Sequence, residues 1–284
     1  MKDRICLVTG ANVGIGLETA RGLAQQGATV VLACRSRTKA EAAAEDIRST
    51  VAGANVELID LDLASLDSVR AAAAAFLATH DRLDVLVNNA GLILTDRRET
   101  AEGFEMQLGV NHLGHFLLTH LLLDALKAAG SARVVNLSSM GHQMSRGLDF
   151  DDLMYTRRTY RDVAVYGDSK LANILFTREL ARRVEGTGIV AHAVHLGAVA
   201  TSFGGDGDAK GWFGLVLKGF GWAFATPAKG ARTSLHVATS DDAGRSTGEY
   251  WASRKRKRPS KQARDDAAAR RLWEVSEQLV GITG

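Results

Sequence analysis

The sequence predicts an α/β protein built on one doubly wound parallel sheet of about seven strands, with helices on both faces. Two observations predict this fold. Short apolar runs without polar alternation recur along the chain, as expected of strands that helices cover on both sides. Stretches with helical spacing of apolar residues separate these runs. Regular alternation of strand and helix gives right-handed crossovers, and therefore a parallel sheet.

Six of the runs are rich in Val, Ile and Leu, and a seventh candidate strand lies near the end of the chain. The expected strands cover residues 5–8, 29–33, 56–59, 83–87, 133–137, 189–194 and 248–251. Helices are expected over residues 17–26 and 166–184. Apolar spacing of threes and fours marks two more, at Leu66, Val69, Ala73, Phe76 and Leu77, and at Leu272, Ser276, Leu279 and Val280.

Composition indicates one domain over residues 1–284. The chain is 46% hydrophobic and 24% charged, which is ordinary for a globular protein, and its two prolines leave no obvious linker. Two cysteines, Cys6 and Cys34, lie in apolar runs and are too few for a disulfide framework. The sequence carries no recognisable secretion signal and no run of about 20 apolar residues. We therefore expect a cytoplasmic protein without a transmembrane segment.

The charge is concentrated at one place. The net charge of the chain is +3, and all five residues from Arg254 to Arg258 are basic. The rest of the chain therefore carries a slightly negative net charge. We interpret the run as a solvated loop between the last strand and the last helix. Nucleic-acid binding through residues 254–258 is the alternative, and it predicts a salt-sensitive affinity. The sequence favours a protein with no nucleic-acid partner.

A glycine-rich loop follows the first expected strand and precedes the first helix. Gly10 permits the turn, Gly14 lets the backbone approach a diphosphate, and Gly16 allows close packing of helix on strand. The helix N-terminus then offers unpaired N–H groups to the phosphates. The spacing G-x-x-x-G-x-G differs from the common fingerprint, but its position favours dinucleotide binding in a Rossmann-type domain over a structural turn. The expected cofactor-binding residues of this loop are Gly10, Asn12, Gly14, Ile15 and Gly16.

The end of the second strand distinguishes the two nicotinamide dinucleotides. It holds Arg35 and Arg37 and no acid, and a guanidinium pairs with the 2′-phosphate of NADP(H). Two solvated loop arginines are the alternative. Asp62 and Leu63, after the third strand, are expected to contact the cofactor. Asp62 accepts from the adenine amino group or, alternatively, caps the helix that starts near Ser65.

One tyrosine stands out among the four. Only Tyr166 is followed at i+4 by a lysine, Lys170, so that both side chains lie on one face of a helix. An ammonium group beside a phenol lowers its pKa from about 10 and so favours proton transfer near neutral pH. A single Tyr-x-x-x-Lys pair is nevertheless frequent by chance.

The whole set of motifs resembles the short-chain dehydrogenase/reductase family. The matching stretches are TGANVGIG at 9–16, NNAG at 88–91, Asn111 within GVNHLGHF, the pair Ser138 and Ser139, and YGDSK at 166–170. Four further stretches resemble its retinol-dehydrogenase-like branch: ACR at 33–35, NHLGHFLLT at 111–119, SKLANILFTREL at 169–180 and RLWEVSEQLVG at 271–281.

The resemblance implies roles for individual residues. Tyr166 is the general acid in reduction and the base in oxidation, Lys170 lowers its pKa and bonds the nicotinamide ribose, and Ser139 bonds the substrate oxygen. Asn111 positions a water that links Lys170 to solvent. The other implied cofactor contacts are Asn89, Ala90, Gly91, Val199 and Thr201. From the residues alone, Ser138 and Ser139 are also consistent with a strand end, and Asn111 with an ordinary helix position.

One residue departs from the family pattern, and one group of histidines raises the question of a metal. Leu196 replaces the usual proline after the sixth strand, which removes a fixed φ from the loop under the nicotinamide. His112, His115 and His120 lie on one expected helix, but no second ligand cluster accompanies them. We therefore expect surface or packing histidines and no metal.

Residues 202–226 are expected to form the loop that covers the substrate. The stretch joins aromatic and aliphatic side chains to many glycines, which indicates an apolar substrate and a hinged lid. A subunit interface or a membrane contact is the alternative. The resemblance implies a homodimer or homotetramer paired through the helices after strands four and five. The predicted function is NADP(H)-dependent oxidation or reduction of a small apolar alcohol or carbonyl compound, and a non-catalytic NADP-binding regulator is the alternative.

Overall fold

The computed structural model describes residues 1–195, 197 and 226–282. Its strands are β1 (Ile5–Thr9), β2 (Thr29–Cys34), β3 (Asn55–Asp60), β4 (Val85–Asn88), β5 (Ala132–Leu137), β6 (Ile189–His195), β7 (Glu249–Ala252) and β8 (Lys255–Lys257). They form one sheet in the order β3-β2-β1-β4-β5-β6-β7-β8, parallel up to β7 and antiparallel between β7 and β8. The strand order reverses between β1 and β4, and the predicted doubly wound fold is confirmed.

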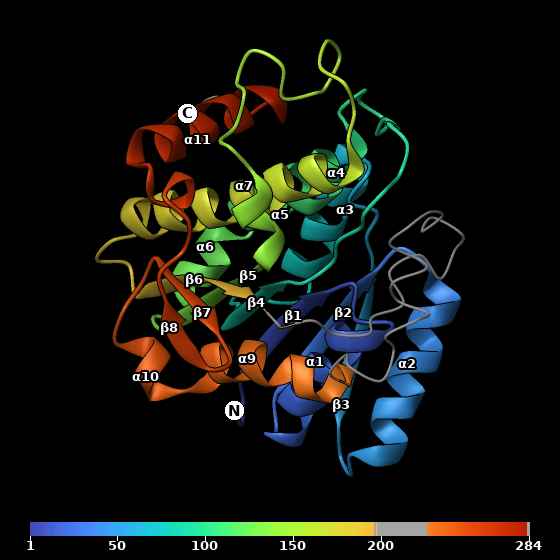
Figure 1. Cartoon of the computed structure of the whole chain (residues 1–284). Helices are drawn as coiled ribbons and strands as arrows, with labels where there is room; N and C mark the ends of the chain where they lie inside the picture. Colours follow the sequence, from blue (N-terminus) through green and yellow to red (C-terminus); the bar gives the residue numbers. More distant parts are fainter. Residues whose placement is uncertain (196, 198–225, 283–284) are drawn as a thin grey trace.

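Helices cover both faces of the sheet (Figure 1). One face carries α1 (Gly14–Gln25), α2 (Arg37–Thr50), α9 (Pro227–Thr239) and the short α10 (Asp241–Gly244). The other carries α3 (Leu66–Leu77), α4 (Met106–Leu108), the π-helical turn η1 (Gly109–Leu113), α5 (Gly114–Leu121), α6 (Leu123–Ala128) and α7 (Asp162–Arg183). Two apolar cores result, one on each side, because the strands are buried on both faces. The stripe predicted along α3 ends at Phe76, since Leu77 is 46% exposed.

The eighth strand corrects the interpretation of the basic run. Residues 254–258 are not simply a loop, because Lys255–Lys257 pairs with β7. Ser253 and Arg254 form the turn, and both have positive φ, as a two-residue hairpin turn with the twist of the strands requires. An exposed edge strand needs no apolar run, and its charges keep other strands from pairing with the edge. Arg256 contacts the ring of Trp251, 5.5 Å from its centroid.

The last helix, α11 (Asp266–Leu279), lies outside α5 and α7 and covers them (Figure 1). The ring of Trp273 packs 4.9 Å from Phe116 on α5 and 5.8 Å from Phe176 on α7, measured between centroids. Arg183 stacks over the same indole at 4.5 Å. These are the two helices through which the resemblance predicts subunit pairing. Where α11 lies on them, their outer faces are buried by the chain itself.

Several predicted features lie outside the described residues: Leu196, Val199, Thr201 and residues 202–225 of the predicted loop. Across the part of the chain that the structure describes, none of the helices combines the length and apolarity needed to cross a lipid bilayer.

Candidate active site

The glycine loop at the end of β1 has the geometry that a diphosphate requires. Gly10 and Gly14 adopt φ of 62° and 59°, which side-chain-bearing residues rarely do. A Cβ at Gly16 would lie 2.4 Å from the carbonyl oxygen of Gly10, so only glycine lets α1 approach the loop this closely. Val13, which precedes α1, provides no side-chain cap, and the first turn holds no acid. The N–H groups of this turn are therefore suited to an anion.

Thr9 connects this loop to the next strand, and the sequence interpretation missed it. Its Oγ1 accepts hydrogen bonds from the backbone N–H groups of Asn89 and Ala90, both at 2.9 Å. The side-chain amide of Asn89 donates in return to the carbonyl oxygen of Thr9 at 2.8 Å and to that of Gly10 at 3.3 Å. Asn89 and Ala90 thus hold the glycine loop in place. A threonine directly before Gly10 was the available signal.

Two of the three histidines are buried and have side-chain partners. His115 Nε2 lies 2.8 Å from Thr9 Oγ1, and its Nδ1 lies 3.2 Å from the carbonyl oxygen of Asn111. Because a carbonyl only accepts, Nδ1 carries the proton and Nε2 accepts from Thr9. Burial lowers the pKa of His115 to about 3, so the ring is neutral. His112 Nε2 lies 2.9 Å from Ser276 Oγ on α11. Both contacts agree with the packing role predicted for these residues.

The predicted 2′-phosphate site contains an acid that the sequence interpretation did not place there. The register of β2 and β3 sets Asp60 beside Cys34, at the strand end where Arg35 and Arg37 follow. The guanidinium of Arg37 pairs with Glu41 at 3.1 Å and with Asp60 at 3.7 Å. Arg35 is exposed at the end of β2. The two arginines therefore lie at one edge with a carboxylate from the neighbouring strand.

A backbone hydrogen bond ties the same strand end to the glycine loop. The N–H of Gly10 donates to the carbonyl oxygen of Ala33, directly before Cys34, at 2.8 Å. Burial raises the pKa of the Cys34 thiol to about 11, and the nearby N–H groups of Ala11 and Asn12 act in the opposite direction. Ile15 is buried in the first turn of α1.

After β3, the structure tests one of the two interpretations of Asp62, the helix cap. Ser65, not Asp62, caps α3, because its hydroxyl accepts from the N–H of Ser68. The Asp62 carboxylate accepts instead from the N–H of Ala64 at 2.9 Å and closes the turn before the helix. The alternative of a helix cap is therefore wrong. Leu63 is buried, with its carbonyl oxygen against Gly114, where a Cβ would come within 2.8 Å.

Asn111 lies fully buried in the π-helical turn, a deviation common at functional sites. Its Oδ1 accepts from the N–H of Leu92 at 2.8 Å, and its Nδ2 donates to the Leu92 carbonyl oxygen and to Ser169 Oγ, both at 3.0 Å. A Cβ on Gly91 would lie 3.1 Å from both Asn111 Oδ1 and Lys170 Nζ. Asn111, Gly91 and Lys170 therefore meet at one point. The water predicted beside Asn111 stays a prediction.

The two serines after β5 differ in what they contact. Ser138 Oγ donates to the carbonyl oxygen of Lys170 at 2.8 Å and so holds α7 against the strand end. Ser139 Oγ accepts from the N–H of Gly141 at 3.1 Å, and a Cβ on Gly141 would lie 3.5 Å from this oxygen and 3.0 Å from the Tyr166 ring. The structure thus brings Ser139 and Tyr166 together, while Ser138 fastens the helix.

Burial controls the ionisation of Tyr166 and Lys170. It raises the pKa of the Tyr166 phenol, and the Ser139 hydroxyl acts in the opposite direction. It lowers the pKa of Lys170 to about 8. The Lys170 ammonium lies 5.6 Å from the centroid of the Tyr166 ring and donates to the Leu137 carbonyl oxygen at 3.3 Å. Lys170 is expected to lower the pKa of Tyr166, whereas burial raises it. The lowering therefore stays a prediction.

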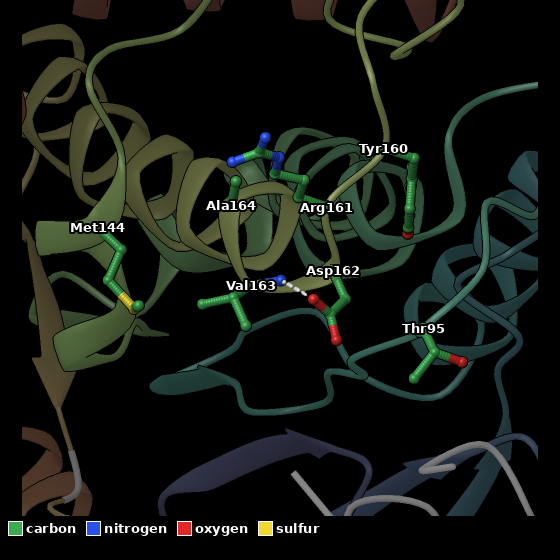
Figure 2. Close-up of a pocket in the computed structure, with 7 residues that line it drawn as sticks. All are labelled: Thr95, Met144, Tyr160, Arg161, Asp162, Val163 and Ala164. Atoms are coloured by element: carbon green, nitrogen blue, oxygen red, sulfur yellow. Dashed lines mark hydrogen bonds between the residues drawn. The ribbon is translucent and has the colours of Figure 1, made fainter. Parts of the chain in front are cut away.

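A cavity of about 580 Å³ opens at the start of α7, next to the turn that carries Tyr166 (Figure 2). Apolar and polar side chains both line it: Thr95, Met144, Tyr160, Arg161, Asp162, Val163 and Ala164. Met144 ends the 3₁₀ turn η2 (Met140–Met144) that follows Ser139. The sequence interpretation assigned none of these residues to the site, because the cavity forms between segments that are irregular or only begin a helix.

Comparisons with known proteins agree with this geometry. The short chain dehydrogenase family profile matches residues 4–149. Human retinol dehydrogenase 13 is 44% identical over 97% of this chain and 84% of its own length, and mouse retinol dehydrogenase 12 is 46% identical over 98% and 87%. An uncharacterized protein of Mycobacterium paratuberculosis superposes with a TM-score of 0.79 at 37% identity, covering 99% of this chain and 94% of that one.

A second solved structure carries a cofactor. It is a Beutenbergia cavernae protein assigned as an NAD(P)-dependent gluconate 5-dehydrogenase, with NADP bound at low occupancy. Its TM-score is 0.70 at 29% identity, over 89% of this chain and 96% of that one.

The sheet order and the glycine loop define a dinucleotide-binding α/β protein, and the chain belongs to the short-chain dehydrogenase family. Within that family it falls in the retinol-dehydrogenase-like branch. It is accordingly an oxidoreductase of alcohol and carbonyl groups that uses a nicotinamide cofactor.

Proposed function

We propose that this protein transfers a hydride between NADP(H) and an apolar alcohol, aldehyde or ketone of retinoid-, lipid-, steroid- or polyketide-like character. The observation that carries the proposal is the grouping of Ser139, Tyr166 and Lys170 at the carboxyl end of β5. The bound cofactor supplies the hydride or accepts it.

The three side chains divide the proton transfer between them. In reduction, the phenol of Tyr166 donates its proton to the substrate oxygen, and in oxidation the phenolate takes it back. Ser139 hydrogen-bonds the same oxygen, where negative charge develops. Lys170, with a pKa lowered to about 8, holds a proton near neutral pH and gives it up more readily than an exposed lysine does. Its charge favours the phenolate form of Tyr166.

The preference for NADP(H) rests on Arg35 and Arg37 at the end of β2. A guanidinium recognises a 2′-phosphate through charge and paired N–H donors. Asp60 works against this preference, because its carboxylate repels the phosphate and occupies Arg37. Asp60→Asn is therefore expected to raise the ratio of NADPH to NADH efficiency about tenfold, and Arg37→Ala to lower it. Equal ratios in both variants and wild type would contradict this assignment.

The class of substrate follows from the cavity at the start of α7 and from the relatives. Met144, Val163 and Ala164 offer it apolar surface, and two relatives are named retinol dehydrogenases. The predicted loop over residues 202–226 adds apolar side chains in sequence. We further infer a cytoplasmic protein, since Cys6 and Cys34 are buried free thiols. The homodimer or homotetramer remains a proposal, and α11 directs it to a surface other than the covered faces of α5 and α7.

The decisive experiment follows the absorbance of NADPH, and separately of NADH, with retinal, decanal and steroid ketones as substrates. Wild-type turnover with NADPH that disappears in Tyr166→Phe supports the cofactor, the acid and the substrate class together. NADPH binding without turnover on any compound would favour the non-catalytic regulator instead.

A further inference from the structure

Two of the segments that line the cavity at the start of α7 are joined through one buried pair, Glu105 and Gln107. The segment after β4 contributes Thr95 to the lining, and the segment directly before α7 contributes Tyr160. Gln107 Nε2 donates to the hydroxyl oxygen of Tyr160 at 2.8 Å and to the carbonyl oxygen of Leu94 at 3.4 Å. A single amide group therefore joins the two segments.

Glu105 also binds the Tyr160 hydroxyl and holds Gln107 in place. Its side chain is fully buried, caps α4 by accepting from the N–H groups of Gln107 and Leu108, and accepts from the Tyr160 hydroxyl at 3.1 Å. The Tyr160 hydroxyl thus donates to a carboxylate and accepts from an amide, so its hydrogen-bonding capacity is directed to these two residues. A hydrogen bond to a charged acceptor is stronger than one between neutral groups. The Tyr160 ring is therefore held in place through its hydroxyl group.

A second set of contacts holds the segment from which Tyr160 projects. Arg97 Nε donates to the carbonyl oxygen of Met154 at 3.0 Å. Tyr155 packs against the ring of Tyr160, with centroids 6.0 Å apart, and its own hydroxyl donates to Asp168 on α7 at 2.6 Å. Tyr155 is absent from the cavity lining, so it braces this segment without facing the cavity.

We propose that Tyr160 determines the selectivity of this cavity for the size of the substrate, and that Glu105 and Gln107 are positioning residues that fix its ring. The proposal rests on the proposed function in one respect, since it requires the carbonyl substrate to enter this cavity. Figure 2 shows the Tyr160 ring at one side of the cavity, opposite Met144. With the hydroxyl removed, nothing polar restrains the ring, and the cavity accepts shapes that the fixed ring excludes.

The test uses Tyr160→Phe in the full chain, with benzaldehyde, decanal and retinal as probes. We expect the ratio of kcat/KM values between the largest and smallest probe to change at least fivefold, with the change in KM rather than kcat. NADPH affinity should stay as in wild type. Glu105→Gln weakens the restraint without abolishing it, because Gln107 still donates to the Tyr160 hydroxyl, so the ratio should change in the same direction and by less. Adding Glu105→Gln to Tyr160→Phe should bring no further change, because the hydroxyl on which Glu105 acts is already gone.

The matched control is Tyr155→Phe, which also removes one buried tyrosine hydroxyl in the same segment before α7. It should lower stability and leave the selectivity ratio within twofold of wild type. A ratio that is unchanged in Tyr160→Phe, or that changes equally in Tyr155→Phe, overturns the proposal.

A binding measurement separates this proposal from the proposed function. The dissociation constants of the three probes for the NADPH-loaded protein are measured by quenching of tryptophan fluorescence, which requires no turnover. Selective binding that Tyr160→Phe alters supports the proposal even where the wild type turns over none of the probes, an outcome that would count against the proposed function alone. Wild-type binding without selectivity, or no binding, overturns the proposal.

Discussion

The hydroxyl of Thr9 lies 2.8 Å from Nε2 of His115, and this contact joins the glycine loop to the helix that carries Asn111. The same hydroxyl oxygen accepts from the N–H groups of Asn89 and Ala90. One buried oxygen therefore fixes three segments around the nucleotide site: the end of β1, the end of β4 and the start of α5.

Thr9→Val preserves the shape of the side chain and removes all three hydrogen bonds. Two buried N–H groups and one imidazole nitrogen lose their partner, and each costs about 1–3 kcal/mol when left unsatisfied. We expect a loss of at least about 2 kcal/mol in the free energy of unfolding and weaker NADPH binding, measured by urea denaturation and fluorescence titration. Thr9→Ser retains the hydroxyl and should lie near wild type. A Thr9→Val protein as stable as wild type would refute the linking role.

Ser138→Ala and Ser139→Ala compare two adjacent serines, one that holds α7 against the end of β5 and one that is proposed to act in catalysis. Ser138 donates to the Lys170 carbonyl, so its loss should cost about 1 kcal/mol of stability with a small effect on kcat. Ser139 contacts Tyr166 and the proposed substrate oxygen, so its loss should lower kcat by about 10²–10³, while the lost hydrogen bond from the Gly141 N–H should cost about 1 kcal/mol of stability, as at Ser138. Steady-state kinetics and thermal denaturation of both variants test this. The reverse pattern would exchange the two roles.

Lys170 is expected to make stability depend on pH. Burial lowers its pKa from 10.5 to about 8, so between these values the unfolded chain binds more protons than the folded one, and stability rises with pH. Between pH 7 and pH 10.5, the stability of wild type should therefore rise relative to that of Lys170→Met by about 3 kcal/mol. The variant should also lose turnover.

Urea denaturation of both proteins from pH 7 to 10.5 measures this difference. Lys127→Met, at a half-exposed lysine of α6, is the control for the loss of a lysine side chain and is measured over the same pH range. A pH-independent difference for Lys170→Met would show that burial does not shift its protonation.

Trp273→Ala tests how α11 is held on α5 and α7. The change removes ring contacts with Phe116 and Phe176 and the stacking of Arg183, and should cost about 3–5 kcal/mol of stability. Trp273→Phe keeps part of the packing and should lose less. Light scattering on both proteins shows whether the uncovered aromatic face leads to association. A Trp273→Ala protein with wild-type stability would mean that α11 does not depend on this contact.

The sequence by itself determined the fold class and brought the catalytic candidates together. Strands buried on both faces are continuous apolar runs, and a doubly wound sheet places the carboxyl ends of parallel strands at one edge. The strand pattern placed Gly10 at that edge, whereas the assignment of Ser139 and Tyr166 to the same site came from the resemblance to the short-chain dehydrogenase/reductase family. The edge strand β8 escaped prediction because a strand exposed on both faces has no apolar pattern.

Only the tertiary structure decided which polar groups meet across distant segments. Thr9 with His115, Asp60 with Arg37 and Glu105 with Tyr160 are pairs set by strand register and helix packing, and no local spacing encodes them. The different surroundings of Ser138 and Ser139 likewise depend on the fold, because one hydroxyl faces the Lys170 carbonyl and the other lies beside the Tyr166 phenol. Side-chain direction depends on what packs around a residue, and that is a property of the folded chain.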